Sequence, residues 1–361
     1  MPCQAIRGVD YRRDSLALIL VTGGRGHLGA NLVRRLMDDS HQVRVLVRPG
    51  NDNGALRGLD VHVVYGDLRD RVSLNTAVRG CDRIYHCAAL LSTMRGRERE
   101  IYACNVLGTR NLLAAARDAG VTRVVVTGSL SAIGHDPYRP VDEQMPFYPF
   151  GKQLPYSHTK ALVEHECLKA VVDGLDTVIA TSTAILGPND FTPSRMGRVL
   201  LDFAHRRLPA YVPGGFEFVS AADVVEGHLL AMERGRAGHK YIFSTQFLAM
   251  DELMDLYQEV TGVKRPPLRV PEPLMAGIAA VSEAIVGRLF PSVALQVTPA
   301  AVRFLRMRPR ADCAKAHREL GYRPTSIADG VAAAYECFRQ RGLIHRAGRA
   351  GSGIRRSERV R

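Results

Sequence analysis

Long apolar runs are missing from this chain of 361 residues. No stretch reaches the roughly 18 uninterrupted apolar residues that a membrane-spanning helix requires. The longest candidates are 16–21, which has the length of a strand, and 274–286, which Glu283 interrupts. The N-terminus also lacks the order of basic, apolar and small residues that marks a signal peptide. We therefore expect no membrane span and a cytoplasmic location.

Paired cysteines are missing as well. The chain has seven cysteines, an odd number, and none of them forms a C-x-x-C pair. Isolated cysteines in a chain of this length usually behave as small apolar groups with reduced thiols. The spacing therefore favours free thiols over a disulfide framework or a metal site.

Basic stretches interleaved with aromatic residues, which would indicate stacked bases of a nucleic acid, are also absent. The formal net charge is +13, but the segment 345–361 alone holds six arginines and one glutamate. That segment has almost no apolar side chains, so we expect it to be disordered. The other basic residues are scattered. A solvated basic surface is therefore favoured over a nucleic-acid partner.

Apolar strand-like runs alternate with helical patterns from residue 16 onward. The run 16–22 is apolar almost throughout, as a strand buried on both faces requires. Strands are expected at 16–22, 42–47, 61–65, 83–89, 121–127 and 177–183, and helices at 28–37, 98–119 and 156–172. This alternation predicts an α/β fold with a doubly wound parallel sheet of the Rossmann type, joined by right-handed crossovers.

A glycine-rich motif joins the first expected strand to the first expected helix. It reads G-x-G-x-x-G from Gly24 to Gly29. Glycines permit a tight turn and let backbone N–H groups approach a pyrophosphate, and the helix N-terminus adds free donors. The strand before the motif and the amphipathic helix after it are the context in which the motif indicates a dinucleotide site.

The residue at the end of the second expected strand bears on which dinucleotide binds. An acidic residue is typical there for NAD, because it accepts hydrogen bonds from the ribose, but this chain has Arg48. A guanidinium can pair with the 2′-phosphate of NADP, and Arg25 could add a second contact. NADP(H) is therefore favoured over NAD(H). Asp67 is placed to meet the adenine edge, and the small Ala88 and Ala89 leave room for the cofactor.

A Y-x-x-x-K pair, Tyr156 and Lys160, falls on the helix expected at 156–172. Positions i and i+4 share one helix face, so the phenol and the ammonium can enter one cleft. The ammonium favours the phenolate form, and the phenol can then exchange a proton with a carbonyl oxygen. A hydroxyl at the end of the fifth strand should polarise that oxygen. Ser129 and Ser131 are both candidates, and Ser129 is favoured because it is nearer the strand end.

The rhythm of strands and helices changes after Gly187. Residues 188–215 are rich in Pro, Gly and Arg, and we expect them to be irregular loops. The domain organisation that we expect is an irregular leader (1–15), a dinucleotide-binding domain (16–187, with 216–244 returning to it), a smaller, mostly helical substrate-binding subdomain (188–215 and 245–343) and a disordered basic tail (344–361).

These segments together resemble a known family. TGGRGHLG, YHCAA, NVLGTRNLL, TGSLSAIG, YSHTK and ILGP are similar to motifs of the extended short-chain dehydrogenases/reductases, in the branch that resembles dihydroflavonol 4-reductases and 3β-hydroxysteroid dehydrogenases. The resemblance covers 16–343. It implies Ser129, Tyr156 and Lys160 as the catalytic triad, with Tyr156 and Lys160 also touching the cofactor. It implies as further cofactor contacts Thr22, Gly23, Gly24, Arg25, Gly26, His27, Leu28, Gly29, Asp67, Leu68, Asn105 and the segment 182–186, with Thr183 and Ile185.

The chain departs from this family at two places. The family often has Ser-Ser where this chain has Gly128-Ser129, and Asn-Pro-Ser where it has Thr181-Ser182-Thr183. In members that act on sugar nucleotides, the Asn touches the substrate and the Pro shapes the nicotinamide pocket. Their replacement weakens the interpretation as a sugar-nucleotide enzyme.

Three functions follow from this resemblance. The favoured one is an NADPH-dependent reductase that transfers a hydride to a ketone or aldehyde of a fairly apolar small molecule, with Tyr156 as proton donor. The second is a sugar-nucleotide epimerase or dehydratase with tightly bound NAD, and the third is a non-catalytic dinucleotide sensor. A metal ion is not expected, and the chain is expected as a monomer or as a homodimer formed through 98–119 and 156–173.

Deleting 345–361 is expected to leave the fold and the catalytic activity unchanged. The segment is too polar to bury the area that would offset the entropy cost of ordering it. Thermal unfolding and turnover of the full-length and truncated chains check this. A large drop in melting temperature, or a loss of activity, would show that the tail docks onto the folded part.

Overall fold

The computed structural model describes residues 17–50, 52–91, 97–136, 138–147, 155–271, 274, 277 and 305–344. The leader expected at 1–15 lies outside these residues, and so does the segment 345–361. Within the described residues, no helix has the length and apolar content needed to cross a membrane.

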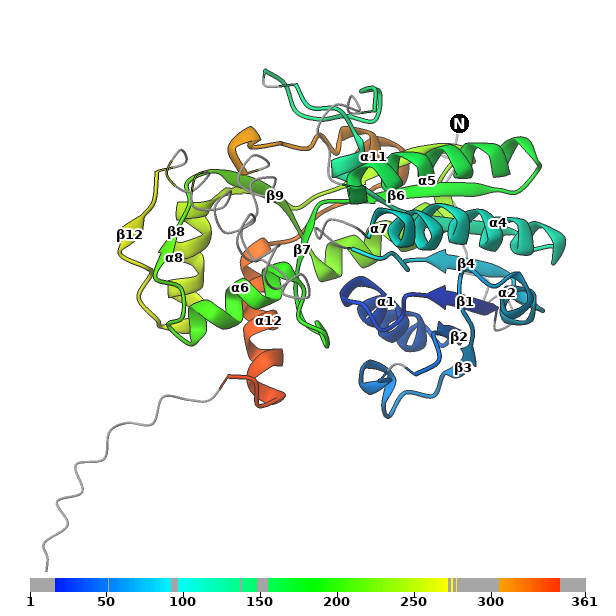
Figure 1. The fold of residues 1–361 in the computed structure, drawn as a ribbon, viewed down its shortest axis with the longest axis horizontal. Coiled ribbons are helices and arrows are strands. Elements are labelled where there is room, and N and C mark those ends of the chain that lie inside the picture. The colour runs from blue at the N-terminus through cyan, green and yellow to red at the C-terminus, as the bar shows by residue number, and fades with distance from the viewer. Residues whose placement is uncertain are drawn as a thin grey trace, which may run out of the picture.

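A parallel sheet of seven strands forms the centre of the larger lobe (Figure 1). Its strand order is β3-β2-β1-β4-β5-β6-β10, and every neighbouring pair is parallel. The strands are β1 (Leu18–Thr22), β2 (Gln42–Val47), β3 (His62–Tyr65), β4 (Arg83–His86), β5 (Arg123–Ser129), β6 (Thr177–Ser182) and β10 (Lys240–Phe243). The order reverses between β1 and β4, which confirms the doubly wound α/β fold.

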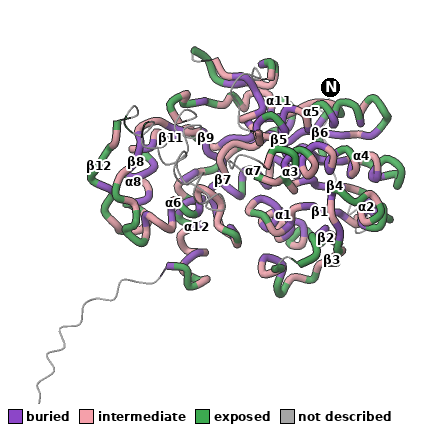
Figure 2. The backbone as a smooth tube through the Cα atoms, viewed as in Figure 1, coloured by how far each residue is buried: buried purple, intermediate pink, exposed green. Residues whose placement is uncertain are grey.

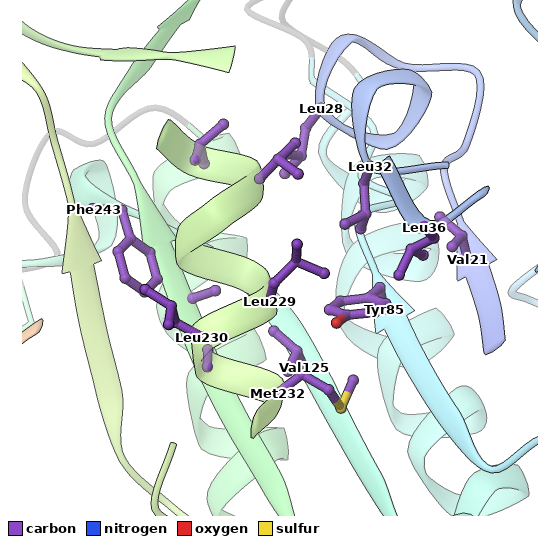
Figure 3. Close-up of a cluster of buried hydrophobic side chains, with 14 of the residues drawn as sticks. Val21, Leu28, Leu32, Leu36, Tyr85, Val125, Leu229, Leu230, Met232 and Phe243 are labelled. Atoms are coloured by element: carbon purple, nitrogen blue, oxygen red, sulfur yellow. The ribbon is translucent and has the colours of Figure 1, made fainter. Parts of the chain in front are cut away.

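Helices cover both faces of this sheet. One face carries α1 (His27–Asp38), α7 (Ala221–Arg234) and α11 (Ala314–Leu320), and the other carries α2 (Arg71–Val78), α4 (Gly108–Asp118) and α5 (Pro155–Val172). Figure 3 shows the first core, in which Leu32 of α1 and Leu229 of α7 point towards Tyr85 of β4. Because the strands are buried from both sides, their sequences are apolar at consecutive positions rather than at alternate ones. Figure 2 shows this burial, from which the edge strand β3 departs because its residues are intermediate or exposed.

A smaller lobe lies beside the large sheet, with its own apolar core (Figure 1). It contains a three-stranded sheet in the order β11-β9-β7 and a two-stranded sheet of β8 and β12. Its elements are β7 (Ala184–Leu186), α6 (Arg195–Ala204), β8 (Ala210–Tyr211), β9 (Gly215–Ser220), β11 (Gln246–Ala249), α8 (Met250–Thr261), β12 (Leu268–Arg269) and α12 (Ile327–Gln340). The chain passes repeatedly between the lobes, because α7 and β10 return to the large sheet after β9.

One expectation about secondary structure was wrong, and a second was right only in part. The stretch 188–215 is not irregular throughout, because it contains α6, which begins where the Ser194 hydroxyl accepts a hydrogen bond from the Gly197 N–H at 3.1 Å. The long helix expected at 98–119 is present over 98–118, but it is not α-helical throughout. It consists of α3 (Glu98–Tyr102), a π-helical segment (Ala103–Leu107) and α4. Such π-helical segments often occur at functional sites.

Candidate active site

The turn between β1 and α1 has room only for glycine at two positions. Gly23 has a φ of +73°, and a Cβ there would lie 2.6 Å from the Ala88 backbone nitrogen. A Cβ on Gly29 would come within 2.2 Å of the Gly23 carbonyl oxygen. Any side chain would therefore push apart β1, the end of β4 and α1. The turn leaves a backbone cradle at the N-terminus of α1, which is the geometry that binds a pyrophosphate.

A cleft of about 260 Å³ opens at the carboxyl ends of β1, β2, β3 and β4. It brings together many of the residues expected to hold the cofactor: Thr22, Gly23, Gly24, Arg25, Gly26, Arg48, Asp67, Leu68, Ala88 and Ala89. It also includes residues that the sequence analysis missed: Leu46, Val47, Gly66, Cys87, Leu90 and Cys104. Ligands of doubly wound sheets bind at this edge, where the strand order reverses.

Two arginines, Arg25 and Arg48, line the cleft, and a third, Arg69, pairs with the cleft residue Asp67. Arg48 is exposed and follows β2 directly. The Nε of Arg25 is buried without a hydrogen-bond partner. Arg69, which the sequence analysis missed, donates to Asp67 with an Nη2–Oδ2 distance of 2.6 Å. That hydrogen bond, together with the charges of Arg69 and Arg48, lowers the pKa of Asp67. The expected adenine contact is therefore a fully ionised carboxylate already paired with an arginine.

His27, the first residue of α1, does not line this cleft. Its Nε2 lies 3.1 Å from the carbonyl oxygens of both Gly187 and Pro188, and Asn31 donates to the Pro188 carbonyl at 2.8 Å. These bonds fasten the segment after β7 to the start of α1. Leu28 packs into the core beside this helix, so its expected cofactor contact would come from the backbone alone.

A buried chain of hydrogen bonds connects Thr22, which precedes the glycine turn, to α4. The Thr109 hydroxyl donates to the Asn105 carbonyl at 2.5 Å, so His86 Nε2–H must donate to Thr109, 2.8 Å away. His86 Nδ1 then accepts from Thr22 at 2.6 Å, and Thr22 accepts from the Ala88 N–H at 3.3 Å. Burial lowers the pKa of His86 to about 3, which keeps the ring neutral in this tautomer.

Asn105 extends this series of hydrogen bonds from the π-helical segment to α5, the helix that holds Tyr156 and Lys160. Its side-chain oxygen accepts from the Leu90 N–H at 2.7 Å, and its Nδ2 donates to the Leu90 carbonyl at 3.1 Å. The same Nδ2 donates to Thr159 at 3.1 Å, and Thr159 donates to the Tyr156 carbonyl at 2.8 Å. Asn105 is buried and does not line the cleft, so it acts here as a link between the cleft wall and α5.

Tyr156, Lys160 and Ser129 lie together where β5 ends and α5 begins. Lys160 Nζ lies 6.0 Å from the centroid of the Tyr156 ring and donates to the Thr127 carbonyl at 2.7 Å. Burial raises the pKa of Tyr156 to about 12, and a hydrogen bond from Ser129 offsets part of that rise. Ser129 Oγ lies 2.9 Å from Ser131 Oγ, so both candidate serines are near the phenol.

Lys160 is the cation of this group. It is only 4% exposed, and burial lowers its pKa to about 8. An ammonium with this pKa is still mostly protonated at neutral pH and becomes neutral as the pH rises through 8. The pair can therefore hold a protonated phenol beside a positive charge, which is the arrangement needed to pass a proton to a substrate oxygen.

Thr183 and Ile185 do not line the cleft, and Ile185 lies in β7, opposite Val219 of β9. Ser129 is opposite Ser182 in the pairing of β5 with β6, so Thr183 follows directly, and its hydroxyl is buried without a hydrogen-bond partner. The two departures from the family motifs also touch. A Cβ on Gly128 would lie 2.6 Å from the Thr181 hydroxyl, so the threonine requires a glycine opposite it.

Comparison with known proteins identifies relatives over most of the chain. Residues 19–243 match the NAD dependent epimerase/dehydratase family. A protein of Methylococcus capsulatus named sterol demethylase protein B is 43% identical over 325 residues, which are 90% of this chain and 99% of that protein. A 4-hydroxy-2-methyl-3-oxo-4-farnesyl-3,4-dihydroquinoline-1-oxide ketoreductase of Stigmatella aurantiaca is 33% identical, covering 92% of this chain and 97% of its own.

A solved structure supports the same assignment. DesIV, a dTDP-glucose 4,6-dehydratase from Streptomyces venezuelae with NAD bound, has 26% sequence identity and a TM-score of 0.74, covering 90% of this chain and 98% of its own. Together with the glycine turn, these matches decide the assignment. The chain belongs to the NAD-dependent epimerase/dehydratase family, among the extended short-chain dehydrogenases/reductases, and is an oxidoreductase.

Proposed function

We propose that the protein is an NADPH-dependent reductase that acts on a ketone or aldehyde of a fairly apolar small molecule. The observation that carries this proposal is the grouping of Tyr156, Ser129 and Lys160 at the carboxyl end of β5, the same edge of the sheet at which the glycine turn and an arginine line a cleft. The bound dinucleotide supplies the hydride. The chain supplies the cradle, the proton and the hydrogen bonds to the substrate oxygen.

Each residue of the triad has a distinct part in this proposal. Ser129 and Tyr156 donate hydrogen bonds to the carbonyl oxygen and so favour the negative charge that develops on it. Tyr156 then releases its phenolic proton to that oxygen, since the neighbouring Lys160 ammonium stabilises the phenolate left behind. Lys160 would also hold the ribose hydroxyls next to the nicotinamide. The reverse sequence oxidises an alcohol.

The apolar substrate is supported by the names of the relatives. One is named for a sterol and the other for a farnesylated quinoline, both of which are large apolar ring compounds. Position 181 holds threonine instead of the asparagine that touches the sugar nucleotide in other members. This replacement also favours an apolar substrate. We infer a cyclic, largely apolar ketone or alcohol as the substrate class.

A preference for NADPH is supported by the rim of the cleft. Arg48 is exposed and forms no ion pair among the described residues, while the carboxylate of Asp67 is paired with Arg69. A 2′-phosphate beside β2 would therefore meet a free guanidinium rather than a free carboxylate. The cavity wall beneath it is apolar, with Leu46 and Leu68.

The second candidate function is a sugar-nucleotide epimerase or dehydratase with tightly bound NAD, and the solved dehydratase relative favours it. Mass spectrometry of the protein as purified separates the two. We expect either no nucleotide or NADPH. Stoichiometric NAD that survives purification would instead indicate a closed cycle of oxidation and reduction. The intact triad argues against the third candidate, a non-catalytic sensor, because a sensor needs no proton donor.

A further inference from the structure

Glu164 is a buried carboxylate that the proposed reaction does not use. It lies on α5 one helical turn after Lys160 and two turns after Tyr156, so all three side chains lie on one face of the helix. Glu164 is 2% exposed. A carboxylate buried to this extent costs free energy unless it has charged or hydrogen-bonding partners, so its position calls for an explanation.

The partners of Glu164 satisfy only half of its carboxylate. Oε2 accepts a hydrogen bond from Lys240 Nζ of β10 at 3.0 Å. Oε1 is buried and has no hydrogen-bond partner. Burial raises the pKa of Glu164, while the charges of Lys240, Lys160 and His165 oppose that rise. The carboxylate is therefore an incompletely neutralised negative charge inside the protein, and the low polarity around it extends its field.

The negative field of Glu164 acts on the ammonium of Lys160. The groups that face its ammonium from the neighbouring strands are the Thr127 carbonyl of β5, the neutral His86 and the thiol of Cys87, whose pKa is raised to about 11 by burial. From the helices it is faced by the phenol of Tyr156, the thiol of Cys167 and neutral His228. Cys87, Cys167 and Glu164 all favour the ammonium, and Glu164 is the only carboxylate that does so among the described residues. Burial raises the pKa of both thiols, so they stay neutral near pH 8 and Glu164 is the group that carries a negative charge.

We propose that Glu164 is a positioning residue for the catalytic lysine: its buried carboxylate holds the Lys160 ammonium in the charged form that binds the cofactor ribose and supports Tyr156. Burial alone favours the neutral amine, which could neither stabilise a phenolate nor donate three hydrogen bonds. The negative charge of Glu164 opposes that loss. The inference rests on the proposed function, in which Lys160 is needed as a cation.

A purely structural role makes a different prediction. The Glu164–Lys240 ion pair joins α5 to β10, and loss of either partner breaks the same bond. A structural role therefore predicts that both losses have the same consequence. The electrostatic role predicts that the pKa of Lys160 shifts in opposite directions in the two variants. Glu164→Gln removes the negative charge near Lys160, while Lys240→Gln leaves that charge without its partner.

The test measures how the NADPH dissociation constant and kcat/KM depend on pH above 7. In Glu164→Gln we expect the affinity for NADPH and kcat/KM to begin to fall at a pH about 0.5–1 unit lower than in the wild type, because the pKa of Lys160 falls. In Lys240→Gln we expect a shift to higher pH. Glu166→Gln is the matched control, since Glu166 lies on the same helix but its carboxylate is paired with the exposed Arg110 and Lys169, and its profile should match the wild type.

The outcomes separate the inference from the proposed function. Shifts of the same sign in both variants, or no shift in Glu164→Gln, overturn the role of Glu164. A wild type that binds NADPH but reduces no ketone overturns the proposed function, and the binding profiles still test Glu164. If Glu164→Gln does not fold, the sign of the shift in Lys240→Gln decides alone, and a shift to lower pH would contradict the inference.

Discussion

Replacement of Tyr156 by Phe is expected to reduce turnover by about 10²–10⁴-fold, which is the usual effect of removing a positioned acid. The substitution deletes one hydroxyl, which lies near Ser129, and keeps the ring that packs beside Lys160. NADPH binding should change little, because Lys160 and the glycine turn remain. Steady-state kinetics on an apolar ketone and a fluorescence titration with NADPH measure the two effects.

The matched control for this variant is Tyr138→Phe. Tyr138 is 96% exposed, so the loss of its hydroxyl should change neither quantity. Near-wild-type turnover in Tyr156→Phe would mean that another group donates the proton. A relay through the substrate itself would then be the first alternative to examine.

Replacement of Arg48 by Asp is expected to change the cofactor preference from NADPH towards NADH. Hydrogen bonds to charged groups contribute about 1.5–3 kcal/mol, which corresponds to roughly tenfold to a hundredfold in affinity. Arg48 is exposed at the rim, and screening by salt should bring the effect towards the lower figure. The new carboxylate repels a 2′-phosphate but can accept a hydrogen bond from a ribose hydroxyl. NADPH should therefore weaken most.

Dissociation constants of both cofactors, on the wild type and the variant, check this prediction. Arg79→Asp makes the same change of charge at an exposed position before β4, away from the cleft, and controls for the general loss of positive charge. Equal binding of the two cofactors by the wild type would contradict the prediction. So would an unchanged ratio in Arg48→Asp, and Arg48 would then be only a solvated residue after a strand.

Features that depend on local sequence could be predicted well. β2 spans Gln42–Val47 as expected, and α5 begins one residue before Tyr156. Both follow from short-range rules, since an apolar run makes a buried strand and a spacing of three and four residues makes a helix. The glycine turn is also local, because its requirement for small residues is visible within one motif.

Features that depend on contacts between distant segments could not be predicted. His86 lies 64 residues from Thr22, and no pattern in the sequence indicates that the two side chains meet. The π-helical segment at 103–107 looks like ordinary helix in the sequence, and only the hydrogen bonds to Leu90 and to Thr159 of α5 give Asn105 its place. Arg69 was missed because its role depends on Asp67, which was interpreted alone. The assignments of individual residues to catalysis and cofactor binding stay predictions.

The route of the chain between the two lobes limits how new substrate preferences could arise by recombination. β6 belongs to the large sheet, β7 and β9 to the small one, α7 and β10 to the large one again, and β11 and α8 to the small one. No single cut exchanges the smaller lobe between relatives without also exchanging α7, which packs against α1, and β10, which pairs with β6. Homologous crossover would therefore tend to disrupt the dinucleotide half. Point substitution in the loops of the smaller lobe is the route that leaves both halves intact.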